Sequence, residues 1–353
     1  MLDRIIAHFN VPGTLADCEP FGAGLINETW RCSFREGASV RRYLLQRINR
    51  RVFARPELVM ENVETVTEHL AARLRKEGAA DPAAISPALV RARDGRSSFV
   101  DDEDGHWRMF LFIEAVDAFD KVKDVNHAYE VGRGIGRFQA LLSDLDPVRL
   151  HDTLPGFHHT PRYLDELGDA VRTDLQGRAS TAGQELAFVE RHRPLAPLLL
   201  DAVAAGGVPL RVVHNDPKVS NVLIDRNSGR ALCLVDLDTV KPGTALFDFG
   251  DCVRSAANPA GEDAADLAQV VFDRASYGAI TRGYLEEAQV FLTADEKELL
   301  PLSVKVITFE LGIRFLADHL RGDAYFRITR PGQNLQRARV QLRLLESMEK
   351  SGL

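Results

Sequence analysis

The chain has 353 residues, 45% of them hydrophobic, and a formal net charge of −7 at pH 7. This length predicts two compact units or one two-lobed domain, with ample apolar material for a buried core. The acidic balance argues against a nucleic-acid partner, because such proteins normally carry a basic patch or stripe, whereas a nucleotide site needs only a few local cations.

The sequence also argues against a membrane partner and against a disulfide framework. The first residues mix acid and base without a long apolar core, so we expect no signal peptide. The most apolar stretch, around residues 194–210, is too interrupted by proline, glycine and Asp201 to span a bilayer. The cysteines form no C-x-x-C pair, so we expect reduced, buried thiols in the cytoplasm at Cys18, Cys32, Cys233 and Cys252.

The first third of the chain is predicted to be mainly β structure with one helix. Residues 17–55 contain short aromatic and apolar runs separated by turn-like segments, which is typical of strands. Residues 56–76 change to helical character, because Pro56 suits a first helical turn and larger residues recur at fourfold spacing. A hairpin is predicted over 97–113, where an acidic, glycine-bearing turn separates two apolar runs.

Strands become rare after about residue 115. An amphipathic helix is predicted over 129–145, although three glycines weaken the prediction in its first half. Helices then dominate, apart from a β-rich island at 209–240. Strands first and helices later, without a regular βαβ alternation, favour an α+β arrangement of two lobes.

The β-rich island contains a pattern that suits phosphoryl transfer. His214-Asn-Asp216-Pro-Lys218-Val-Ser-Asn221 leads into an apolar strand, and a second apolar strand ends at Asp236. A loop Asp can accept a hydroxyl proton, while an Asn five residues on and an Asp at the end of the adjacent strand can hold Mg²⁺ against phosphate oxygens. The alternative is a polar surface turn before a buried hairpin.

This pattern also resembles a known family. His214 to Asn221 with Leu234-Val-Asp236-Leu-Asp238 is similar to the phosphotransferase family of aminoglycoside and choline kinases. The longer run 235–254 resembles bacterial N-acetylhexosamine 1-kinases, and the similarity extends to segments 43–53, 107–114, 157–158 and 310–318. The resemblance implies a protein-kinase-like two-lobed fold. Its small mixed β-sheet lobe, residues 1–114, would bind the nucleotide, and its larger helical lobe, residues 115–353, would carry the catalytic loop and the acceptor site.

The resemblance also implies roles for individual residues. Asp216 would be the general base, and Lys218 would lie near the transferred phosphoryl group. Asn221 and Asp236 would be magnesium ligands. Asp248 would brace the catalytic loop from the start of a helix, and a plain helix N-cap is its alternative role.

The nucleotide pocket departs from the kinase pattern at one strand. Gly22 and Gly24 lie where a glycine-rich loop could cradle phosphates through backbone N–H groups, although an ordinary hairpin turn has the same sequence signature. The third strand lacks the expected phosphate-pairing lysine. Strand alternation places Gln46 at that position, so we predict that Gln46 lines the pocket and consider Arg47 the only nearby cation that could substitute. Adenine is expected to meet the backbone of a hinge at Ile113 and Glu114, which does not distinguish ATP from GTP.

Three side chains are candidates for contacting the acceptor. Arg314 lies four residues from Glu310, either as an exposed salt pair or as an arginine that grips a sugar oxygen while Glu310 fixes its rotamer. The family resemblance favours the second interpretation. His158 either supplies hydrogen bonds to a sugar or lies on the surface, and Asn27 could also face the acceptor.

Three functional hypotheses follow. The first is an ATP- and Mg²⁺-dependent kinase that phosphorylates the anomeric hydroxyl of an N-acetylhexosamine such as GlcNAc or GalNAc. The second is a kinase of another small acceptor, such as an aminoglycoside, choline or an amino alcohol, which acidic residues in the acceptor cleft would favour. The third is a nucleotide-binding scaffold without catalysis, which the missing lysine keeps open but the three residues Asp216, Asn221 and Asp236 oppose.

Overall fold

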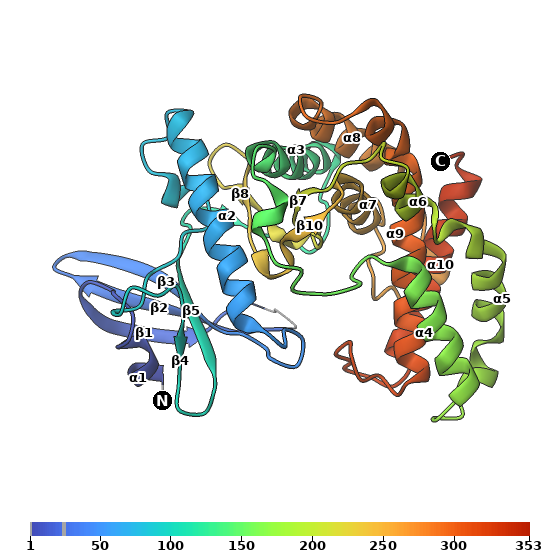
Figure 1. Cartoon of the computed structure of the whole chain (residues 1–353), viewed down its shortest axis with the longest axis horizontal. Helices are drawn as coiled ribbons and strands as arrows, with labels where there is room; N and C mark the ends of the chain where they lie inside the picture. Colours follow the sequence, from blue (N-terminus) through green and yellow to red (C-terminus); the bar gives the residue numbers. More distant parts are fainter. Residues whose placement is uncertain (1, 23–25) are drawn as a thin grey trace.

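A computed structural model describes residues 2–22 and 26–353 of the chain. It has two lobes, with the N-terminal strands on one side and most helices on the other (Figure 1). The small lobe contains a five-stranded sheet in the order β1-β2-β3-β5-β4, with strands Thr14–Pro20, Glu28–Glu36, Ser39–Arg47, His106–Leu111 and Phe99–Val100. Every pairing in it is antiparallel, which corrects the expectation of a mixed sheet.

The two faces of this sheet pack against different partners because side chains alternate along each strand. Tyr43, Leu45 and Trp107 join a buried cluster with the short helix α1 (Leu2–Ile6). The opposite face meets α2 (Pro56–Lys76), which lies between the sheet and the large lobe (Figure 1). The predicted helix over 56–76 is thereby confirmed at both ends.

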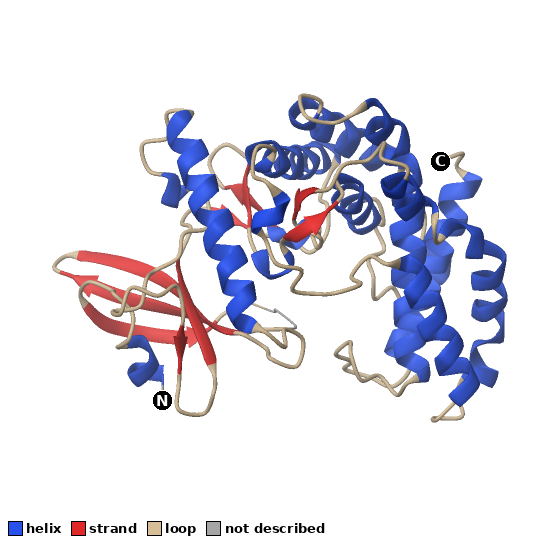
Figure 2. Cartoon of the chain, in the orientation of Figure 1, coloured by secondary structure: helices blue, strands red, loops and turns tan. Residues whose placement is uncertain are grey.

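The large lobe is mainly helical, and its few strands lie next to the small lobe (Figure 2). Strand β6 (Val116–Asp117) pairs with β8 (Val222–Asp225), which pairs with β9 (Ala231–Leu234), and β7 (Arg211–Val213) pairs with β10 (Lys241–Gly243). The helices are α3 (Val125–Leu142), α4 (Thr160–Thr173), α5 (Gly183–His192), α6 (Leu198–Ala204), α7 (Ala245–Ala256), α8 (Arg274–Ala288), α9 (Ala294–Leu320) and α10 (Gln333–Lys350).

The glycines that weakened the prediction of a helix at 129–145 have a packing role. A side chain at Gly132 or Gly136 would collide with the backbone oxygens of Ile280 and Tyr284 in α8. The glycines therefore allow α3 and α8 to approach closely, and α3 starts earlier than predicted, at Val125. Among the described residues, no helix is both long enough and apolar enough to cross a membrane.

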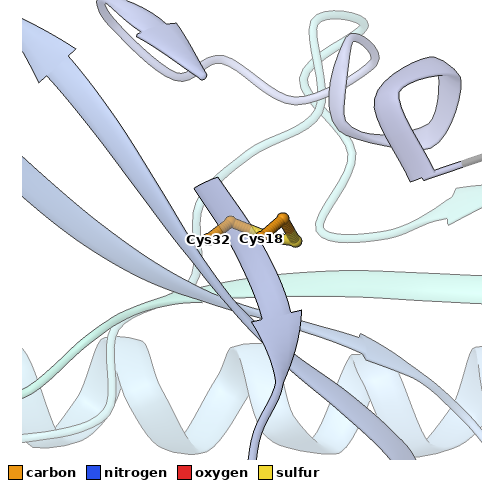
Figure 3. Close-up of a disulfide and its surroundings, with 2 residues drawn as sticks. All are labelled: Cys18 and Cys32. Atoms are coloured by element: carbon orange, nitrogen blue, oxygen red, sulfur yellow. A yellow bond between two sulfur atoms is a disulfide. The ribbon is translucent and has the colours of Figure 1, made fainter. Parts of the chain in front are cut away.

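One expectation about the cysteines is wrong. Cys18 on β1 and Cys32 on β2 are directly opposite one another, with Cα atoms 4.0 Å apart, and a disulfide joins them (Figure 3). Strand register brings the pair together, which a separation of 14 residues in sequence could not reveal. Cys233 and Cys252 are free, and burial raises the pKa of the Cys233 thiol to about 12.

Candidate active site

The predicted catalytic loop follows β7 and is held by a buried carboxylate. Asp248, in the first turn of α7, accepts hydrogen bonds from the backbone N–H groups of His214 at 2.9 Å and Asn215 at 2.7 Å. Its position is fixed in turn by Gln139 of α3, whose Nε2 donates to Asp248 Oδ2 at 2.8 Å. The N-cap of α7 is Thr244, so Asp248 braces the loop and does not cap the helix.

Asp216 lies beyond this braced segment, with a side chain that is 34% exposed. Lys218 donates from Nζ to Asp216 Oδ2 at 2.8 Å. Burial acts to raise the pKa of Asp216, but the Lys218 ammonium outweighs it and, with His214 and Arg254, holds this pKa below its usual range. The carboxylate is therefore ionised at neutral pH and can accept a proton.

Asn221 and Asp236 lie at the adjacent ends of the β8–β9 hairpin, as predicted. Val235 N–H donates to the Asn221 carbonyl at 2.9 Å, and Asn221 Nδ2 donates to the Asp216 carbonyl at 2.8 Å. The second bond leaves the amide oxygen of Asn221 as its free end. Asp236 has φ of 66°, a left-handed conformation that is uncommon for residues other than glycine but that Asp adopts more readily than most.

The residues around Asp236 fit a magnesium ion. Burial and then the neighbouring Asp238 carboxylate raise the pKa of Asp236, and Lys218 offsets this only in part. A carboxylate whose charge is disfavoured in this way is stabilised by a bound cation, and carboxylate and amide oxygens are the ligands that Mg²⁺ prefers. Asn221 and Asp236 would hold the ion, where it would neutralise charge on phosphate oxygens.

His158 has a different role from the one predicted, since it is buried behind the catalytic loop. Its Nδ1 bonds to Glu310 Oε1 at 2.9 Å, and its Nε2 bonds to the Asn215 carbonyl at 3.0 Å. The other oxygen of Glu310 accepts from Thr160 Oγ1 at 2.7 Å. His158 therefore neither contacts a sugar nor lies on the surface. Glu310 is likewise committed to His158 and Thr160, so it does not fix Arg314 as expected.

The structure gives the orientation of the two candidate side chains on β3, and that of Arg47 corrects the expectation that it could substitute for the lysine. Gln46 faces the inter-lobe side of β3, where its Oε1 accepts from Arg108 Nε at 2.9 Å and its Nε2 donates to Thr29. Arg47 points to the other face, with its guanidinium 5.7 Å from the centre of the Trp107 ring. Arg108, which sequence reasoning missed, is the buried cation beside Gln46.

The remaining nucleotide-side residues have mixed outcomes. Gly22 has φ of 77°, as a tight turn before the loop requires, and Gly24 lies outside the described residues. Ile113 is buried at the connection between the lobes. The Glu114 side chain is exposed and pairs with Arg42 at 2.8 Å, so only its backbone is placed to serve as a hinge contact.

Asn27 is bonded within the protein at both ends of its amide. Its Nδ2 donates to Asp238 Oδ2 at 2.6 Å, and its Oδ1 accepts from the backbone N–H of Asn49 at 2.9 Å. Asn27 therefore ties the end of the glycine segment to the turn after Asp236. Its contact with the acceptor stays a prediction, and the structure gives it a role in joining the lobes.

A cavity of about 320 Å³ lies between the lobes, bounded by Val52 and Ala54 of the small lobe and by α4, α9 and the segment after α9. Arg314 lines it and is surrounded by the rings of Phe157, Tyr163, Tyr325 and Phe326, with ring centres 4.9–5.8 Å from its guanidinium carbon. No carboxylate among the described residues forms an ion pair with Arg314. The predicted acceptor-side arginine is thus placed in a cavity, with its charge unpaired.

Two lobes, a braced loop bearing Asp216 and a strand-end Asp236 define the class of protein-kinase-like phosphotransferases. The sequence profile of the phosphotransferase enzyme family (APH) matches residues 17–281, and the chain belongs to this family. It is a small-molecule phosphotransferase of the aminoglycoside phosphotransferase and choline kinase type.

Solved structures share the fold over nearly the whole chain. Spectinomycin phosphotransferase in complex with ADP and spectinomycin is 9% identical, with a TM-score of 0.61 over 99% of this chain and 97% of that one. An aminoglycoside phosphotransferase from Alicyclobacillus acidocaldarius (13% identity, TM-score 0.62) and a choline kinase from Cryptosporidium parvum (13%, 0.61) each match 99% of this chain and 95% of their own. At these identities the likeness shows the fold alone.

Proposed function

We propose that the protein is an ATP-dependent kinase that phosphorylates the anomeric hydroxyl of an N-acetylhexosamine. Asp216 accepts the hydroxyl proton, and Lys218 keeps the Asp216 carboxylate ionised and lies beside the transferred phosphoryl group. Magnesium held by Asn221 and Asp236 would neutralise the phosphate charge. The observation that carries the acceptor class is the cavity around Arg314.

The depressed pKa of Asp216 suits an anomeric hydroxyl. A strongly ionised carboxylate is a weak base, and general-base catalysis works best when the pKa values of base and acceptor are not far apart. An anomeric hydroxyl is more acidic than an ordinary alcohol, so a weaker base can accept its proton. Catalysis then depends mainly on positioning and on charge neutralisation.

The charges of the cavity favour a neutral sugar over a cationic acceptor. Its two acidic lining residues, Glu166 and Asp318, are already engaged. Glu166 pairs with Arg162 and Arg321, and Asp318 accepts three backbone N–H groups and the Asn334 amide. A cationic aminoglycoside or amino alcohol would therefore find no spare carboxylate among the described lining residues.

The aromatic rings need a separate argument, because they could also hold a quaternary ammonium such as choline. Arg314 already lies over all four rings and brings its own positive charge, which opposes a second cation. Its guanidinium donors instead suit sugar hydroxyl or acetamide oxygens. The volume, near the lower end for ligand pockets, also suits a monosaccharide better than a multi-ring aminoglycoside.

The donor is proposed to be a nucleotide bound between β3, the glycine segment and the connection between the lobes. The similar fold of spectinomycin phosphotransferase was solved with ADP, which supports this proposal. Gln46 lines this region in place of a lysine, with Arg108 beside it.

An ATP-consumption screen over N-acetylhexosamines, other sugars, aminoglycosides, choline and amino alcohols tests the proposal, with NMR of the product. We expect turnover of an N-acetylhexosamine and a phosphate on C1. Asp216→Ala is the matched inactive control for contaminating ATPase activity. Turnover of choline or an aminoglycoside without turnover of any sugar would replace the proposed acceptor with one of the alternatives.

A further inference from the structure

The cation nearest to the position of the missing lysine comes from a neighbouring strand. Gln46 on β3 and Arg108 on β5 are direct cross-strand partners. Both side chains therefore point to the inter-lobe face of the sheet, and Arg108 Nε donates to Gln46 Oε1 at 2.9 Å. Arg108 thus lies next to the place where a protein kinase has its phosphate-pairing lysine.

Arg108 forms an ion pair that joins the two lobes. Its Nη1 pairs with Asp238 Oδ1 of the large lobe, and the two side chains are only 1% and 3% exposed. Burying two charges costs free energy that their attraction does not always recover, so a buried pair is weak evidence for stability alone. A role in fixing one arrangement of the lobes accounts better for its presence at this point.

Asp238 connects this pair to two parts of the proposed nucleotide site. It lies two residues after Asp236, within one short helical turn, Leu237–Thr239. Its second oxygen, Oδ2, accepts the hydrogen bond from Asn27. Asn27 lies at the end of the glycine segment, just before β2, so this bond joins that segment to the large lobe. A shift of Asp238 would therefore move both Asp236 and Asn27.

We propose that Arg108 is a positioning residue, which through Asp238 holds Asp236 and the end of the glycine segment in the arrangement that binds a magnesium-nucleotide. The Arg108–Asp238 pair takes the place of the lysine–glutamate pair that protein kinases require. This inference rests on the nucleotide half of the proposed function and is independent of the acceptor.

ADP binding measured by calorimetry, with Mg²⁺ and with EDTA, tests the inference. Because Arg108 is proposed to act through the metal-binding Asp236, Arg108→Met should weaken ADP binding in Mg²⁺ by roughly tenfold to a hundredfold, the loss expected for a charge-assisted contact. Binding in EDTA should change by about threefold or less. Arg108→Lys, which keeps the charge opposite Asp238, should recover most of the loss in Mg²⁺.

Variants of the ion-pair partner Asp238 and of a control residue, Arg133, distinguish a positioning role of Arg108 from a general effect on stability. Asp238→Asn should reproduce the loss in Mg²⁺, and the double variant should be no weaker than either single one, because both remove the same contact. Arg133 of α3 forms a comparable, largely buried pair with Glu130 of the same helix and also pairs with Glu287 of α8. Arg133→Met should lower Tm similarly without changing the ratio of the two ADP affinities.

Several results would overturn the inference. One is an Arg108→Met variant whose ratio of ADP affinity in Mg²⁺ to ADP affinity in EDTA equals that of the wild-type protein. The other is an Arg133→Met variant in which this ratio changes as much as it does in Arg108→Met. If Arg108→Met does not fold, the nearly isosteric Asp238→Asn decides by the same ratio. Failure of the wild-type protein to bind ADP would sink the nucleotide proposal as well, whereas failure to phosphorylate a sugar would leave this inference standing.

Discussion

The brace of the catalytic loop makes a quantitative prediction for Asp248→Asn. The Asp248 side chain is fully buried and accepts two backbone N–H groups, one on each oxygen, plus the amide of Gln139. Asparagine has the same shape, so no cavity forms. The asparagine side chain keeps one acceptor oxygen, but its NH₂ group replaces the other oxygen and would face a hydrogen-bond donor of the protein.

The magnitude follows from these contacts. A hydrogen bond to a charged group contributes about 1.5–3 kcal/mol, and a neutral one about 1 kcal/mol. One backbone N–H also loses its partner in a buried place, which costs about 1–3 kcal/mol. Burial raises the pKa of Asp248, so asparagine, which carries no charge to bury, recovers part of this loss. We therefore expect Asp248→Asn to lower the free energy of unfolding by about 2–4 kcal/mol, a large part of the roughly 5–15 kcal/mol of a typical domain.

Urea denaturation of the two proteins, followed by the far-ultraviolet circular dichroism of the helical lobe, measures this difference, and kcat reports the effect on the loop. Thr244→Ala is the matched control, because Thr244 caps the same helix through Leu246 N–H without touching the loop. We expect it to cost about 1 kcal/mol and to leave kcat nearly unchanged. A loss for Asp248→Asn no larger than that of Thr244→Ala, with kcat retained, would refute the proposed brace.

Three further predictions concern the loop and the cavity. Glu310 raises the pKa of His158 despite burial, so the contribution of His158 to stability is full below about pH 6.5 and is lost as the pH rises through the raised pKa. His158→Gln should remove this alkaline decline in the free energy of unfolding, and an unchanged pH slope would contradict it. Arg314→Leu should raise the KM for the acceptor by about tenfold or more and leave the KM for ATP unaffected, whereas equal changes in both would argue against an acceptor contact. Asp216→Ala should abolish phosphoryl transfer while the Kd for ADP stays within about threefold, and retained activity would exclude Asp216 as the base.

The parts that the sequence predicted well depend on local patterns. The fourfold spacing after Pro56 defined α2, and the apolar runs ending at Asn221 and Asp236 defined a hairpin whose ends lie together. The two-lobed arrangement followed from the order of strands and helices along the chain. In each case neighbouring residues carry the information, so no tertiary contact had to be known.

The residues that were mispredicted depend on contacts between distant segments. Arg108 was overlooked because it lies within an apolar run, and its partner Asp238 is 130 residues away in sequence. His158 was expected to contact a sugar or to lie on the surface, but it is buried and bonded to Glu310, 152 residues away in sequence. Cys18 and Cys32 meet only through strand register. An arginine inside an apolar strand was the one local signal that could have indicated a buried ion pair.

The short segment after Asp236 connects the two sites that catalysis must align. From the small lobe it is contacted by Arg108 and Asn27 at Asp238, and Asn62 of α2 donates to the Val240 carbonyl at 3.0 Å. From the catalytic loop, Asn215 Nδ2 donates to the Thr239 carbonyl at 2.9 Å, and Thr239 Oγ1 donates to the His214 carbonyl at 2.7 Å.

Because of these hydrogen bonds, the segment after Asp236 and the catalytic loop should move together. A nucleotide that pulls the small lobe closer would therefore act on Asp238 and, through Thr239, on the backbone that carries Asp216. Catalytic alignment in this protein then depends on the lobes being joined at one segment, and loss of a contact on the nucleotide side should lower kcat as well as nucleotide affinity.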